Sequence, residues 1–246
     1  MKFFKIFLFT FILISPSYAN TIFYLIKIPN LEIHKNKTIN GLKYLKAIKT
    51  FDVGIRDNNV KCFRTNNRSI EKKFDLIEKN FNRYNREFLD KIGLRYIVLC
   101  ENLTVSAIES AGVPNAKVRT LIIDIKFNED YFERILHHEV FHIIDENFSN
   151  YFLKDEWIKF NNLNFNYAEC STCSDRLGLS LLENNEGFVT EYSMSTPSED
   201  MAEVFSFLMS DKKKIEDKAL NDQILNKKIF FIKNNILKID ENFKFN

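Results

Sequence analysis

The chain has 246 residues and a formal net charge of +2, with 35 lysines and arginines against 33 aspartates and glutamates. Both surplus charges, Lys2 and Lys5, lie in residues 1–19, so the rest of the chain is formally neutral. This balance gives no electrostatic reason to expect a nucleic-acid ligand or adsorption to an anionic membrane. A hydrophobic content of 45%, with 25 phenylalanines, excludes an intrinsically disordered chain.

Residues 1–19 have the pattern of a secretory signal peptide. Two lysines precede an apolar run, Phe7–Ile14, that only Thr10 interrupts. This run is shorter than the roughly 20 residues that span a bilayer, so the pattern favours cleavage, after Ala19, over a membrane anchor. We therefore expect a secreted or periplasmic protein with no stable membrane insertion after the signal is cleaved.

The rest of the chain contains four cysteines, Cys62, Cys100, Cys170 and Cys173. In an oxidising compartment they favour structural disulfides, and of the three possible pairings we favour Cys62–Cys100 with Cys170–Cys173. A zinc site at the second pair would require another cysteine or histidine pair nearby, which the sequence lacks.

No role can be assigned to the N-terminal part, residues 20–93, from its sequence. Ile22–Ile28 is apolar enough for a strand, and the apolar residues of Leu42–Phe51 have helical spacing. The same kind of spacing predicts one long amphipathic helix over Ser69–Ile92, which Gly93 would end.

The second part of the chain, residues 94–246, combines strand and helix patterns. Leu94–Leu99 and Leu121–Ile125 read as strands, with a turn between them at Gly112–Asn115. A helical pattern follows over Tyr131–Asp145, and the C-terminal part is mainly helical. These elements predict an α+β fold in which a small sheet packs on that helix.

One motif on this helix carries chemistry, His138-Glu139-Val140-Phe141-His142. Residues four apart share a helix face, so both imidazoles can bind one metal ion while Glu139 contacts a water that the metal holds. Zinc lowers the pKa of such a water to about 7, and Glu139 could accept its proton. Core histidines without metal are the alternative, which burial of three ionisable groups disfavours. His137 projects about 100° away from His138 and is predicted to be structural.

A zinc site needs a third protein ligand, and no histidine lies downstream of the motif. Asp145 shares the motif's helix face and could orient a ligand. Two better candidates, Glu199 and Glu203, lie four apart on a helix that Thr196 would cap. One could bind the metal while the other supports a ligating histidine. Because Thr196 and Glu199 also fit a capping box, in which case Glu203 would be the ligand, the spacing leaves both open.

These residues resemble the gluzincin metallopeptidases, and in particular the catalytic domain of anthrax toxin lethal factor and its bacterial relatives. In that family an acidic residue follows the motif as Asp145 does, and a tyrosine precedes the ligand glutamate by seven positions, as Tyr192 precedes Glu199. The resemblance, which covers about residues 94–240, implies a zincin-like catalytic domain with Glu199 as the third zinc ligand. It further implies that Glu203 supports a ligating residue, and that Tyr192 donates its hydroxyl to the oxyanion of the tetrahedral intermediate.

The sequence thus predicts an exported zinc-dependent endopeptidase of the gluzincin type, with a catalytic domain over residues 94–246. Zinc would polarise the scissile carbonyl, Glu139 would activate water, and the strand Leu121–Ile125 could offer its edge to a peptide or protein substrate. Two alternatives stay open, which are a zinc-containing binding or toxin-like module without peptidase activity and a purely structural exported domain.

Overall fold

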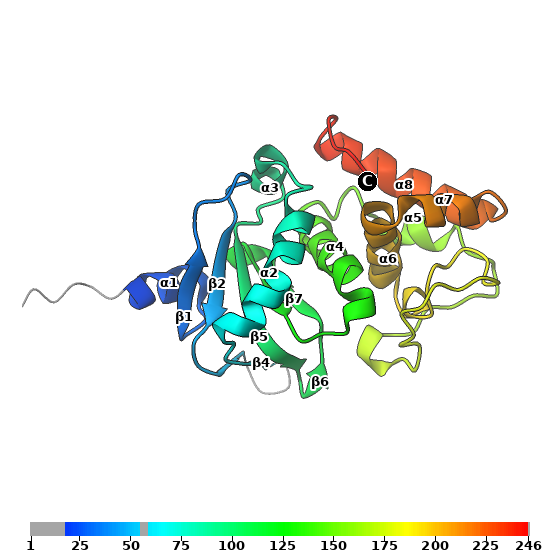
Figure 1. The fold of residues 1–246 in the computed structure, drawn as a ribbon. Helices are drawn as coiled ribbons and strands as arrows, with labels where there is room; N and C mark the ends of the chain where they lie inside the picture. Colours follow the sequence, from blue (N-terminus) through cyan, green and yellow to red (C-terminus); the bar gives the residue numbers. More distant parts are fainter. Residues whose placement is uncertain (1–17, 55–58, 246) are drawn as a thin grey trace, which may run out of the picture.

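The computed structural model describes residues 18–54 and 59–245 (Figure 1). Most of the predicted signal peptide, residues 1–17, lies outside this part of the chain, and its last two residues begin helix α1 (Tyr18–Ile26). Among the described residues, no helix combines the length and the apolar character that crossing a membrane requires.

One mixed sheet is formed by β1 (Leu31–Lys35), β2 (Lys43–Ala47), β3 (Phe51–Val53), β4 (Val60–Phe63), β5 (Tyr96–Val105), β6 (Ile108–Glu109), β7 (Gly112–Asn115) and β8 (Thr120–Asp124). The first half of β5 pairs in parallel with β2 and β8, and its second half pairs in antiparallel with β4 and β6. β1 continues the sheet beside β2, β3 beside β4, and β7 beside β8. β7 is therefore an edge strand.

Alternate residues of β5 face two separate cores, as the two-residue period of a strand requires. Ile97 and Leu99 point into the larger core, and Val98 and Cys100 into the smaller core on the opposite face, where Ile26 of α1 also lies. The larger core is covered by α2 (Asn67–Phe81), α3 (Arg86–Lys91), α4 (Glu129–Asn147), α5 (Lys154–Ile158), α6 (Pro197–Ser210), α7 (Lys212–Ala219) and α8 (Gln223–Ile239). The predicted α+β fold, a small sheet packed on the motif helix with a mainly helical C-terminal part, is confirmed (Figure 1).

The elements around the motif lie close to their predicted places. The strands predicted at Leu94–Leu99 and Leu121–Ile125 are β5 and β8, and the helix predicted at Tyr131–Asp145 is α4. The single helix predicted over Ser69–Ile92 is instead divided into α2 and α3. It is divided because the side chain of Asn85 accepts a hydrogen bond from a backbone N–H of α3 and begins a new helix there.

Three other predictions are wrong. Most of Ile22–Ile28 is helix α1 and not a strand, since a short apolar run does not distinguish the two. Leu42–Phe51 forms β2 and the start of β3 and not a helix, because β2 faces both cores and so lacks the alternation of a half-buried strand. Gly112–Asn115 is not a turn but β7, where Pro114 is tolerated because an edge strand pairs on one side only.

Both predicted disulfides, Cys62–Cys100 and Cys170–Cys173, are present. Cys62–Cys100 joins β4 to β5 inside the smaller core and spans 38 positions of sequence. Cys170–Cys173 spans 3 positions and closes an exposed loop at the 3-10 helix η3 (Ser171–Cys173). The first pair constrains the fold, and the second constrains one loop.

Replacing Cys62 and Cys100 together by alanine is expected to lower the free energy of unfolding by about 4 kcal/mol, since a long loop is no longer closed in the unfolded chain. Replacing Cys170 and Cys173 in the same way should cost only about 2 kcal/mol. Urea unfolding of both double variants under non-reducing conditions measures the difference. Equal losses would contradict this assignment of the two disulfides.

Candidate metal centre

Helix α4 places the motif between the sheet and α6 (Figure 1). The side chain of Asn128 caps α4 by accepting a hydrogen bond from the backbone N–H of Asp130 at 2.9 Å. Apolar side chains of the helix are buried in the larger core, namely Phe132, Leu136, Val140, Phe141, Ile143 and Ile144. This packing fixes the helix, and His138 and His142 approach Glu199 of α6.

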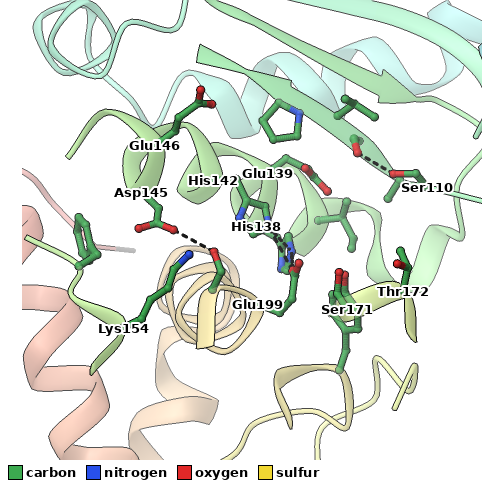
Figure 2. Close-up of a pocket in the computed structure, with 18 of the residues that line it drawn as sticks. Ser110, His138, Glu139, His142, Asp145, Glu146, Lys154, Ser171, Thr172 and Glu199 are labelled. Carbon is green, nitrogen blue, oxygen red and sulfur yellow. Dashed lines mark hydrogen bonds and ion pairs between the residues drawn. The ribbon is translucent and has the colours of Figure 1, made fainter. Parts of the chain in front are cut away.

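Three side chains from α4 and α6 converge at one point (Figure 2). Nε2 of His138 lies 3.1 Å from Nε2 of His142, and Oε2 of Glu199 lies 3.0 and 3.2 Å from these two nitrogens. Ligands at tetrahedral angles on one zinc, each about 2.0–2.1 Å from it, lie about 3.3 Å apart. Two imidazoles and one carboxylate, with a fourth position open, are also a donor set of catalytic zinc sites. The residues therefore fit zinc.

Helix α6 brings Glu199 to this point, as its predicted cap implies. Oγ1 of Thr196 accepts a hydrogen bond from the backbone N–H of Glu199 at 3.3 Å, while the carboxylate of Glu199 turns toward the two histidines. One turn further on, Oε1 of Glu203 accepts a hydrogen bond from Nδ1 of His138 at 2.8 Å. In this arrangement Glu199 has the position of a metal ligand. Glu203 has the position of a residue that orients the imidazole of His138.

The charges of the cluster complement one another. Burial alone would lower the pKa of His138, but the hydrogen bonds with Glu199 and Glu203 outweigh it and raise the pKa to about 10. Burial likewise opposes the charge of Glu199, yet His142 and His138 hold the pKa of this carboxyl well below its usual range. The carboxylates therefore favour a cation at the imidazole nitrogens, where a proton and a metal ion compete.

Glu139 lies at the floor of the same cleft, against the edge strand β7. A Cβ atom on Gly112 would lie 2.6 Å from Cγ of Glu139, so only glycine allows this approach. Burial raises the pKa of the Glu139 carboxyl, and the nearby charges of His138 and His142 partly offset this effect. A carboxylate whose pKa is raised in this way is a stronger proton acceptor than an exposed one.

Tyr192, in the 3-10 helix η4 (Tyr192–Met194), borders the same cleft as Glu139 and Glu199. Its ring centroid lies 5.9 Å from that of His138. Burial, followed by the negative charges of Glu199 and Glu139, raises the pKa of Tyr192. Its hydroxyl therefore keeps its proton and can act as a hydrogen-bond donor beside the cluster.

Two further residues of α4 lie close to the cluster without joining it. Oδ2 of Asp145 accepts a hydrogen bond from the Ser198 hydroxyl at 2.9 Å, so it contacts the helix that carries Glu199 and not a ligating histidine. His137 lies on the other side of α4, where it accepts from the Tyr84 hydroxyl at 2.6 Å and donates to Asn80 at 3.0 Å. Burial also lowers the pKa of His137 to about 3, so the ring is neutral, and its buried place and these two hydrogen bonds agree with the predicted structural role.

Two partners of Glu203 are not among the residues predicted from the sequence. Its Oε2 accepts hydrogen bonds from the guanidinium of Arg134 and, at 2.7 Å, from the hydroxyl of Thr190. Arg134 could have been noticed, because it lies four positions before His138 in a helix whose neighbouring residues are buried. Thr190 lies in a loop and has no sequence signal.

The cleft above the cluster has a volume of about 1490 Å³. One wall is the edge strand β7 with the residues before it, and Ser171 and Thr172, from the segment between α5 and α6, lie across the cleft (Figure 2). Leu179 of the same segment also lines the cleft. The prediction that Leu121–Ile125 offers an edge is wrong, because β8 is paired on both sides, with β5 and β7. The edge strand beside the cluster is β7.

Comparison with known proteins identifies a family for this chain. A family described as "Putative zinc-binding metallo-peptidase" matches residues 113–240, and the chain belongs to this family of zinc-binding metallopeptidases. Zinc is thus its metal, and peptides or proteins are its substrate class. A solved structure from Bacteroides caccae with the same description is 17% identical over 78% of this chain and 76% of that chain, with a TM-score of 0.45. No curated protein matches the chain.

Proposed function

We propose that this chain is an exported zinc-dependent endopeptidase of the gluzincin type, in which His138, His142 and Glu199 hold the zinc ion. The observation that carries the proposal is the meeting of these three donors within 3.2 Å of one another, beside the buried carboxyl of Glu139 and at the floor of a large cleft. Export is supported by the pattern of residues 1–19 and by the two disulfides.

The residues around the cluster have complementary tasks in this proposal. Bound zinc lowers the pKa of a coordinated water to about 7 and polarises a carbonyl group. Glu139 accepts the proton of the attacking water and returns it to the leaving amine. Glu203 holds the His138 ring by its Nδ1–H, so that Nε2 faces the ligand position.

The free edge of β7 is the proposed binding strand for substrate. Backbone groups on one side of this strand pair with β8, and its other side borders the cleft. An extended peptide could pair with that side and pass over Glu139, which touches Gly112 of the same strand. Backbone pairing of this kind would hold the scissile bond at a fixed depth in the cleft.

The test of the proposed function is to measure metal content and peptide cleavage on the same purified protein. We expect about one zinc per chain and cleavage of a peptide library that a chelator abolishes and added zinc restores. Zinc without cleavage would favour the binding-module alternative. A chain without zinc that remains folded would refute the proposal.

Tyr192→Phe is expected to lower kcat about 100-fold with KM and zinc content nearly unchanged, because one hydroxyl donor to the oxyanion is lost. Steady-state kinetics on a cleaved library peptide measure the effect. Tyr131→Phe is a matched control, since the Tyr131 hydroxyl bonds Ser180 at 2.8 Å and not the cluster. Equal kcat values for the two variants would remove Tyr192 from the mechanism.

A further inference from the structure

Arg134 is a buried charge that none of the steps above uses. It lies on α4, one turn before His138, and its side chain is only 8% exposed. Its guanidinium lies over the rings of Phe207, at 4.5 Å, and Tyr131, at 5.6 Å. Burying a cation is costly unless it is paired and hydrogen-bonded, so the partners of this side chain indicate what it is for.

The two arms of the guanidinium reach two different parts of the site. Nη1 donates to Oε2 of Glu203, whose other oxygen holds Nδ1 of His138 at 2.8 Å. Nη2 donates to the backbone carbonyl of Leu179 at 2.6 Å. Leu179 belongs to the segment between α5 and α6 and lines the cleft together with Leu177.

We propose that Arg134 is a positioning residue that joins the support of a zinc ligand to the wall of the substrate cleft. Through Glu203 it fixes the ring of His138, and through the Leu179 carbonyl it fixes the apolar wall formed by Leu177 and Leu179. Zinc affinity and substrate affinity thus depend on one side chain that contacts neither ligand. This inference rests on the proposed function.

A planar guanidinium with several donors can serve both partners, whereas the single ammonium of lysine is a point charge. Arg134→Lys keeps a cation beside Glu203 but cannot reach the Leu179 carbonyl at the same time. Arg134→Gln removes the cation beside Glu203, whose carboxylate then keeps only the hydrogen bonds from Thr190 and His138. The two variants therefore separate the two arms.

The experiment measures the zinc dissociation constant by competition with a chromophoric chelator, and KM and kcat on a cleaved library peptide. We expect Arg134→Gln to raise the zinc dissociation constant about 10–100-fold, as the loss of an outer partner of a metal ligand does, and to raise KM. Arg134→Lys should raise KM while its zinc dissociation constant stays within about threefold of wild type.

Arg83→Gln is a matched control. Arg83 also pairs with an α4 carboxylate, Glu133 at 3.0 Å, and with an α6 carbonyl, that of Met209, but it contacts neither the cluster nor the cleft wall. The zinc dissociation constant and the KM of the Arg83→Gln variant should equal those of wild type.

The inference is overturned if Arg134→Gln keeps both constants within about twofold of wild type, or if Arg83→Gln shifts them equally. If Arg134→Gln does not fold, the KM of Arg134→Lys is the deciding measurement. A KM equal to that of wild type would then overturn the inference. Failure of the proposed function looks different, because wild type itself would then lack zinc or cleavage.

Discussion

Glu139→Gln is expected to keep about one zinc per chain and to lower kcat by a factor of about 10³ or more, because an amide cannot accept a proton from water. Glutamine has the shape of glutamate and fits the same space against Gly112, where a Cβ would lie 2.6 Å from Cγ of residue 139. Zinc content and kcat are measured on the same preparation, so that loss of metal is not mistaken for loss of the base.

Glu146→Gln provides the control for that experiment. Glu146 borders the same cleft, and its carboxylate accepts a hydrogen bond from the backbone N–H of Ala116 at 3.3 Å. The Glu146→Gln variant should therefore retain the kcat of wild type. Hydrolysis by Glu139→Gln at more than about a tenth of the wild-type rate, which is about 100 times the expected residual activity or more, would refute Glu139 as the base.

A second large effect is expected at the two glutamates of α6. Glu199→Gln should lose most of its zinc, because a neutral amide replaces the one anionic ligand proposed. Glu203→Gln should weaken zinc binding by only about 10–100-fold, since Glu203 acts through Nδ1 of His138 at 2.8 Å. The zinc dissociation constants of the two variants show which substitution weakens zinc binding more. A larger effect of Glu203→Gln than of Glu199→Gln would make Glu203 the ligand.

The site could be predicted as far as local spacing determines it. His138, Glu139 and His142 lie within one helical turn, so the period of a helix was enough to place them on one side of α4. Glu199 and Glu203 also share a face, but which of them meets the histidines depends on how α6 packs against α4. The resemblance to gluzincins was needed to favour Glu199, and the structure places its carboxylate beside both imidazoles.

Two of the errors in the fold share a physical cause, which is pairing between distant segments. Lys43–Ala47 is a strand because β5 and β1 pair with it on either side, which no local pattern reveals. Gly112–Asn115 has turn residues but pairs with β8. The contact of Arg134 with Leu179 joins positions 45 apart in sequence, so it also could not be inferred locally.

The placement of the three donors on two helices has a consequence for folding. His138 and His142 come from α4 and Glu199 from α6, so an ion held by all three cross-links the ends of the segment that carries Cys170–Cys173. Binding to the native state alone also shifts the folding equilibrium, by about 2.7 kcal/mol when free zinc is 100 times its dissociation constant. Zinc supply would then govern how much of this chain stays folded, and with it how long the chain resists degradation by other peptidases.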